Sequence, residues 1–128
     1  MNRLIEYNNC EIIKNDGFNR NCILRRCRIY QMLSNKPVLY NRSWLYDCYL
    51  EVSGTFAGIT IASSTNFEFD FIGNRVIFKD VNSNDYLFKG NSFTGNIRNN
   101  IITGAKTTTL WYSNLDGSSN NVINGTVS

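Results

Sequence analysis

The chain has 128 residues, a formal net charge of +3 and 42% hydrophobic residues. This length suits one domain, and apolar residues are too plentiful for a disordered chain. So small a charge, without a known binding motif, argues against a nucleic-acid partner. The unusual feature is asparagine, which occurs 20 times against a single proline. Because asparagine disfavours helices and ordinary strands, so many asparagines indicate turns that recur along the chain.

The cysteine spacing, the absence of histidine and the first residues of the chain indicate whether a metal site, disulfides or an export signal should be expected. No two of the four cysteines form a C-x-x-C pair and the chain has no histidine, so we expect no metal site and no cofactor. The first residues lack the apolar core of a signal peptide, and no apolar stretch is long enough to span a bilayer. We therefore expect synthesis in the cytoplasm, no membrane partner, and thiols without disulfides at Cys10, Cys22, Cys27 and Cys48.

An internal repeat follows the frame apolar-x-x-(Asn or Cys)-x-apolar, and we call its Asn or Cys the pivot. The frame occurs at residues 7–12, 24–29, 45–50, 71–76, 88–93 and 97–102, with pivots Cys10, Cys27, Cys48, Asn74, Asn91 and Asn100. A seventh segment, 122–127, has Gly125 at the pivot. The steps between pivots are 17, 21, 26, 17, 9 and 25 residues. All but the step of nine suit one coil of stacked strands, so Asn91 and Asn100 are expected on two sides of neighbouring coils.

Each frame has the features of a tight bend between two short strands. The two apolar residues point inward, while the pivot takes an unusual backbone angle or fills a tight place inside the corner. Asparagines can bond to one another from layer to layer, and cysteine is small enough to stack there instead. Strand patterns at 58–61, 66–71 and 75–78 support this view. We expect one corner to hold Cys10, Cys27, Cys48 and Asn74 in successive layers.

This repeat resembles the parallel β-helix repeat of the pectin-lyase-like superfamily, which includes pectate lyases, polygalacturonases and many phage tailspikes. The segments 88–93 and 97–102 resemble it most. The resemblance implies an all-β fold, a right-handed parallel β-helix of five or six short coils. It would form a single domain over residues 1–128, either as a whole protein or as an excerpt of a longer chain. An irregular β-sandwich with asparagine-rich turns is the alternative fold.

Glu68 and Asp70 are the candidate catalytic pair. They alternate with Phe67, Phe69 and Phe71, so both acids should project from one outer face of a strand. Sugar-cleaving β-helix enzymes work with acidic clusters, so these two would be the acids of an enzyme. A solvated strand face explains the same alternation more simply. We carry over no catalytic residue from the resemblance, and we expect a protein that is not an enzyme.

Aromatic residues are the candidate ligand-binding groups. Trp44, Tyr46 and Tyr49 lie within six residues of one another. Exposed tryptophan and tyrosine rings stack on sugars and form hot spots in protein interfaces. The alternative is that these rings pack against loops of the same chain. We expect these three residues to form the binding site.

A short, asparagine-rich β-helix without a capping helix resembles modules of phage fibres and tailspikes, which are often trimers. The resemblance implies a structural or receptor-binding module of a virion fibre, tailspike or similar surface assembly. Its partners would be further copies in a homotrimer or other virion and surface proteins, and its ligand a polysaccharide. Two other functions remain open: a polysaccharide-degrading lyase or glycoside hydrolase, whole or in part, and a protein scaffold without a ligand.

Overall fold

The structure is a computed structural model that describes residues 4–13, 22–33, 39–40, 43–53, 59–62, 68–79, 88–89, 94–105 and 118–127. Every regular element in these ranges is a β-strand, and the strands form three sheets. The all-β class predicted from the sequence is therefore confirmed. No helix within these ranges has the length and apolar character needed to cross a membrane.

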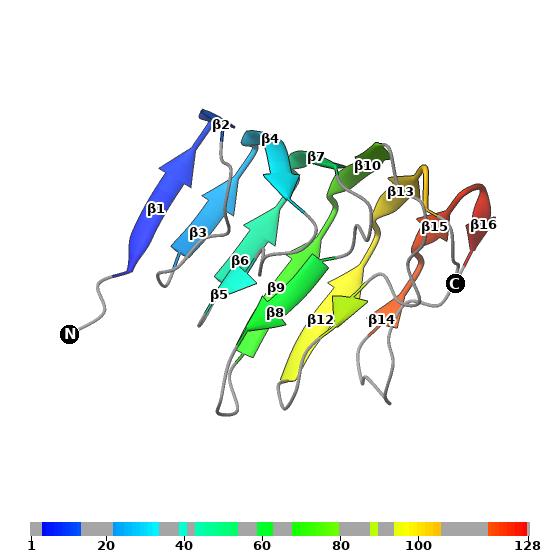
Figure 1. Ribbon diagram of the computed structural model, residues 1–128. Coiled ribbons are helices and arrows are strands. Elements are labelled where there is room, and N and C mark those ends of the chain that lie inside the picture. Colours follow the sequence, from blue (N-terminus) through cyan, green and yellow to red (C-terminus); the bar gives the residue numbers. More distant parts are fainter. Residues whose placement is uncertain are drawn as a thin grey trace.

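Two long sheets contain most of the strands (Figure 1). The six-stranded sheet has the order β1 (Ile5–Asn8), β3 (Cys22–Arg25), β6 (Ser43–Tyr46), β9 (Glu68–Ile72), β12 (Thr94–Arg98) and β14 (Ser118–Ser119). The seven-stranded sheet has the order β2 (Glu11–Ile13), β4 (Arg28–Leu33), β7 (Tyr49–Ser53), β10 (Arg75–Lys79), β13 (Ile101–Thr103), β15 (Val122–Ile123) and β16 (Thr126–Val127). The third sheet consists of β5 (Leu39–Tyr40), β8 (Ile59–Ala62) and β11 (Phe88–Lys89).

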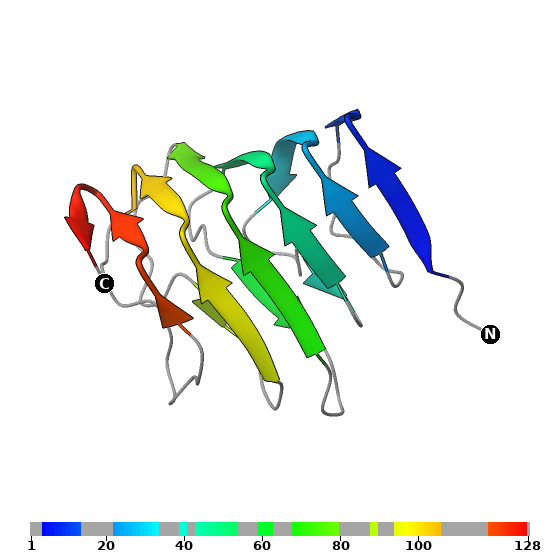
Figure 2. The same cartoon turned by 180° about the vertical axis from the view of Figure 1, so that it is seen from behind.

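The chain alternates between the two long sheets. A strand of the six-stranded sheet leads through a two-residue bend into a strand of the seven-stranded sheet, and this strand–bend–strand unit occurs six times. Neighbouring units pair in parallel, for instance β1 with β3 and β2 with β4. Parallel strands need a connection of roughly a dozen residues or more, which the long steps between pivots supply. Figure 2 shows the units side by side, with β1 and β14 at opposite ends.

The first residue of every bend has a positive φ, between 51° and 71°. These residues are Asn9, Arg26, Asp47, Gly73, Asn99 and Asn120. Glycine, asparagine and aspartate tolerate this left-handed conformation best, and five of the six residues are of these types. The second residue of each bend is the pivot. The unusual backbone angle therefore belongs to the residue before the pivot, and the pivot itself fills the corner.

The pivots stack on one another from unit to unit. The residue after a pivot donates a backbone hydrogen bond of 2.8–2.9 Å to the pivot carbonyl of the preceding unit, as from Arg28 N to Cys10 O. The same bond runs from Arg75 N to Cys48 O. The expected stacking of the first four pivots is therefore confirmed. The whole column consists of Cys10, Cys27, Cys48, Asn74, Asn100 and Asn121.

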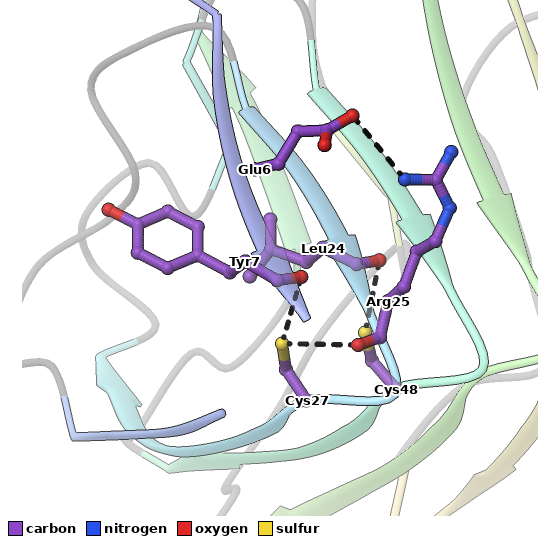
Figure 3. Close-up of polar contacts among 6 residues, drawn as sticks. All are labelled: Glu6, Tyr7, Leu24, Arg25, Cys27 and Cys48. Carbon is purple, nitrogen blue, oxygen red and sulfur yellow. Dashed lines mark hydrogen bonds and ion pairs between the residues drawn. The ribbon is translucent and has the colours of Figure 1, made fainter. Parts of the chain in front are cut away.

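Weak hydrogen bonds hold the cysteine half of this column (Figure 3). The Cys27 sulfur lies 3.4 Å from the carbonyl oxygens of both Tyr7 and Arg25, and these two acceptors share its single proton. The Cys48 thiol donates to Leu24 O, also at 3.4 Å. Burial raises the pKa of the Cys48 thiol to about 11, so this thiol stays protonated at neutral pH. All four cysteines are free thiols in the structure.

The asparagine half of the column is a ladder of buried side chains. Asn100 Oδ1 accepts a hydrogen bond from Asn74 N–H at 2.8 Å, and Asn100 Nδ2 donates to Phe71 O at 2.8 Å and to Asn121 Oδ1 at 2.9 Å. Asn74 Oδ1 accepts from Cys48 N–H at 2.8 Å, which joins the ladder to the cysteine half. Every amide of this ladder that is buried thus has a partner, as buried polar groups require.

The core lies between the two long sheets, beside the pivot column. Residues on both sides of each pivot are 0% exposed in most units. Burying one such side chain stabilises the fold by about 1.5–3 kcal/mol. These residues are Leu24, Leu45, Phe71 and Ile97 in the six-stranded sheet, and Ile29, Leu50, Val76, Ile102 and Ile123 in the seven-stranded sheet.

Two of the expected pivots, Asn91 and Gly125, have different outcomes from the others. Asn91 lies outside the described residues, and the next pivot after Asn74 is Asn100, 26 residues later. The assignment of Gly125 as a pivot is wrong, because Asn121 holds that position. Gly125 instead forms a two-residue turn with Asn124, at φ values of 86° and 49°, between β15 and β16, which pair antiparallel. An Asn-Gly pair with two positive φ angles is the preferred turn of a tight hairpin.

Candidate functional site

Alternation along the strands gives the six-stranded sheet a core face and an outer face. In both β3 and β6, buried residues alternate with half-buried ones. The strand registers align the outward residues in two rows that cross the strands. From β1 to β12 these residues are Glu6 and Asn8, Ile23 and Arg25, Trp44 and Tyr46, Asp70 and Ile72, and Asn96 and Arg98. The outer face therefore places aromatic rings directly beside charged and amide side chains.

Four side-chain contacts connect this face from β1 to β12. The Glu6 carboxylate lies 3.6 Å from the Arg25 guanidinium (Figure 3), which lies over the Tyr46 ring, 5.6 Å from its centroid. The Tyr46 hydroxyl donates to Asp70 Oδ2 at 2.6 Å. Asn96 Nδ2 donates to Asp70 Oδ1 at 2.8 Å. We call these five residues the polar strip.

The contacts of the polar strip hold its side chains in fixed orientations but contribute little to the stability of the fold. The side chains of Arg25 and Glu6 are 40% and 53% exposed, and such a pair contributes only about 0.2–1 kcal/mol. The Asp70 carboxylate is different, because each of its oxygens already accepts one hydrogen bond. A carboxylate has about four lone-pair positions, so Asp70 can still accept from a bound hydroxyl while its neighbours keep it in place.

Tyr46 is held in its neutral, donating form. Partial burial raises the pKa of its hydroxyl to about 12, with further contributions from the hydrogen bond to Asp70 and the charge of Asp70. The charge of Arg25 acts in the opposite direction. The hydroxyl therefore stays protonated throughout the physiological range and donates to Asp70.

We expect the titration of Tyr46 to depend on Asp70. One tyrosine of the folded protein should ionise near pH 12 in an ultraviolet titration, and this step should be absent in Tyr46→Phe. The Asp70→Asn variant should ionise at lower pH, because the negative acceptor is gone. The folded pKa lies above the ordinary value of 10.0, so this stabilisation is complete below pH 10 and is lost as the pH rises through 12. An unchanged midpoint in Asp70→Asn would contradict the assignment.

The structure brings together two of the three aromatic residues predicted to bind a ligand. Trp44 and Tyr46 share the outer face of β6, and Trp44 is the register partner of Asp70. Tyr49 lies beyond the bend, at the start of β7 in the seven-stranded sheet. Its ring is 5.9 Å from that of Tyr30 and belongs to a different surface. Trp44 and the polar strip therefore define the candidate site, and Tyr49 lies apart from it.

The two candidate acids also differ in their surroundings. Asp70 is part of the polar strip, where Tyr46 and Asn96 donate to it. Glu68 begins the same strand, β9, and its register partner is Thr94, but its side chain lies outside the described residues. The described contacts of Asp70 are those of an oriented hydrogen-bond acceptor.

Three residues of the strip were not singled out from the sequence: Glu6, Arg25 and Asn96. Each lies two or four residues before a pivot, at an outward position of its strand. The repeat frame could have identified these residues, because residues at equal distances from stacked pivots lie side by side on neighbouring strands. Aligning outward positions by their distance from the pivot would have placed Asp70 between Trp44 and Asn96.

No group of three or more histidine, cysteine, aspartate or glutamate side chains in the described part of the chain is arranged to hold a metal ion. Comparisons of the chain with protein-family models, with curated proteins and with solved structures found no match.

Proposed function

We propose that this chain is a right-handed parallel β-helix of the pectin-lyase-like kind, serving as a receptor-binding structural module of a virion fibre, tailspike or similar surface assembly. Its ligand is a glycan, and the outer face of the six-stranded sheet binds it. The observation that carries the proposal is the presence of Trp44 beside the oriented Asp70 carboxylate on one regular surface.

The topology supports the fold part of the proposal. Units 17 to 26 residues long add one strand to each long sheet in turn, and their pivots stack. A coil that advances by one strand spacing per turn produces this pattern. The β-sandwich alternative is built from antiparallel strands, whereas the pairs between successive units are parallel.

The chemistry of the outer face supports a glycan ligand. The faces of tryptophan and tyrosine rings stack on the apolar faces of sugars. Carboxylate, guanidinium and amide groups exchange hydrogen bonds with sugar hydroxyls, and Asp70, Arg25 and Asn96 supply all three types. The site needs little rearrangement to bind, since the contacts of the strip already fix Asp70.

We expect Trp44→Ala to weaken glycan binding by about ten-fold or more, since aromatic anchors of binding sites contribute over 1–2 kcal/mol. Tyr49→Ala is the matched control, because it removes an aromatic ring from the other long sheet. A glycan array identifies the ligand, and titration calorimetry then compares the variants. Equal binding by both variants, at equal urea midpoints, would contradict the assignment of the site.

An array without any hit, for a chain that is a stable homotrimer, would favour a ligand-free scaffold instead. We further propose the homotrimer that the resemblance to phage fibres and tailspikes implies, and light scattering tests it, with an expected mass of three times the chain mass of 14.7 kDa. If the chain were instead a polysaccharide-degrading enzyme, it would cleave a glycan, and the Glu68→Gln and Asp70→Asn variants would lose this activity. The proposal predicts binding of the glycan without release of reducing or unsaturated ends.

A further inference from the structure

The Asp70 carboxylate carries a charge that no cation in the described part of the chain neutralises. Its two partners are neutral donors, the Tyr46 hydroxyl at 2.6 Å from Oδ2 and the Asn96 amide at 2.8 Å from Oδ1. The described ion pairs form at other acids, Glu6 and Glu51. Neutral donors orient a carboxylate but leave its negative charge uncompensated. Asp70 is therefore a fixed point of negative charge on the outer face of the six-stranded sheet.

The two described arginines of this face do not form an ion pair with Asp70. Arg25 lies 3.6 Å from the Glu6 carboxylate (Figure 3) and 5.6 Å from the centroid of the Tyr46 ring. Arg98 lies beside Ile72, two residues beyond Asp70 along the strand direction. Two further charged residues, which come two positions before Trp44 and Asp70 in the sequence, have opposite signs and lie outside the described side chains: Arg42 and Glu68.

The Trp44 side chain lies next to this carboxylate. Trp44 and Asp70 are register partners on neighbouring parallel strands, which lie about 4.8 Å apart. Trp44 is half-buried, and within the described residues no cation or second ring contacts its indole. The ring of Tyr46 on the same strand differs, because Arg25 already lies over it. Trp44 therefore offers an aromatic surface to a ligand at the place where the negative charge lies.

An aromatic ring beside a carboxylate favours a cationic group over a neutral or acidic one. A ligand ammonium is attracted to the face of an indole and to a carboxylate at once, whereas a ligand carboxylate is repelled by Asp70. The net charge of +3 does not reverse this preference, because charges farther away than roughly 8 Å are largely screened at physiological ionic strength. The local charge of Asp70 therefore decides which sugars the face accepts.

We propose that the glycan bound by this face contains a sugar with a free amino group, and that its ammonium lies between the Trp44 ring and the Asp70 carboxylate. This inference rests on the proposed glycan-binding function and adds the class of sugar to it. The ammonium donates to the lone pairs that Tyr46 and Asn96 leave open on Asp70. An N-acetylated sugar lacks this charge, and an acidic sugar carries the wrong one.

A glycan array that includes free-amine, N-acetylated, uncharged and acidic glycans tests the function and the sugar class together. We expect the hits to be concentrated among glycans with a free amino group. Titration calorimetry should then show that a free-amine hit binds about ten-fold more tightly than its own N-acetylated form. The N-acetylated form loses both the ion pair and the cation–π contact while keeping the same sugar ring.

Two charge variants assign the preference to one carboxylate. Asp70→Asn should reduce the preference for the free amine to about three-fold or less, since only the contact with the Trp44 ring remains. Glu11→Gln is the matched control, because it removes one negative charge from an exposed position in the other long sheet. It should keep the full preference. Urea midpoints close to that of the unchanged chain show that both variants are folded.

The outcomes separate the sugar class from the function. Hits confined to N-acetylated, uncharged or acidic glycans would overturn the amino-sugar inference and leave glycan binding intact, whereas an array without any hit would overturn both. A free-amine preference that persists at full size in Asp70→Asn would also overturn the inference. So would a lysine peptide of equal charge that binds as tightly as the glycan, because charge alone would then be recognised.

Discussion

Replacing Asn100 by alanine is expected to lower the free energy of unfolding by about 3–5 kcal/mol, because the change disrupts several buried hydrogen bonds at once. The Asn100 side chain is 0% exposed, and it bonds to Asn74 N–H, Phe71 O and Asn121 Oδ1. Alanine removes the acceptor of a buried backbone donor in one neighbouring unit and a donor to two oxygens. Urea denaturation followed by circular dichroism measures the change.

Asn99→Gly is the matched control for this prediction. Asn99 is the preceding residue in the same bend, is exposed, and has a φ of 57°, which glycine adopts without strain. We expect its replacement to change the free energy of unfolding by less than about 1 kcal/mol. If Asn100→Ala and Asn99→Gly have equal effects, the buried ladder does not stabilise the stack in the way described here.

The sequence predicted the corner of this fold well, because a chemical requirement recurs there. A small or amide side chain must fill each corner, which is why Cys10, Cys27, Cys48 and Asn74 could be placed in one column. Asn121 escaped the frame, because Ser118 occupies the position where the frame requires an apolar residue. Gly125 matched the frame by chance. Its Asn-Gly pair is a strong hairpin signal, and giving that signal more weight would have avoided the error.

The candidate site was harder to predict, because it depends on contacts between units. Trp44 and Tyr46 were found from residue type alone. Tyr49 is three residues from Tyr46 in sequence, but the intervening bend places it in the other long sheet. Asn96 is 26 residues from Asp70, and only the register of β9 with β12 brings them together. Composition and local alternation carry no information on such pairs, whereas alignment by pivots does.

Gly104→Ala adds a single methyl group, yet we expect it to lower the free energy of unfolding by about 3 kcal/mol or more. Gly104 has a φ of 77°, and a methyl group there would overlap the carbonyl oxygen of Phe78 in the neighbouring unit. That oxygen belongs to the backbone of β10 and cannot move away as a flexible side chain could. The added methyl group therefore strains the local backbone and forces β10 and β13 apart.

Gly125→Ala separates these two contributions. Gly125 has a φ of 86°, but its added methyl group would meet nothing within 4 Å. This variant should therefore show the backbone strain alone, about 1–2 kcal/mol. Thermal or urea unfolding of the two variants side by side gives the difference, which measures how tightly successive units pack. If Gly104→Ala lost no more stability than Gly125→Ala, the strands would have room to separate. That result would contradict the close stacking that the buried pivots require.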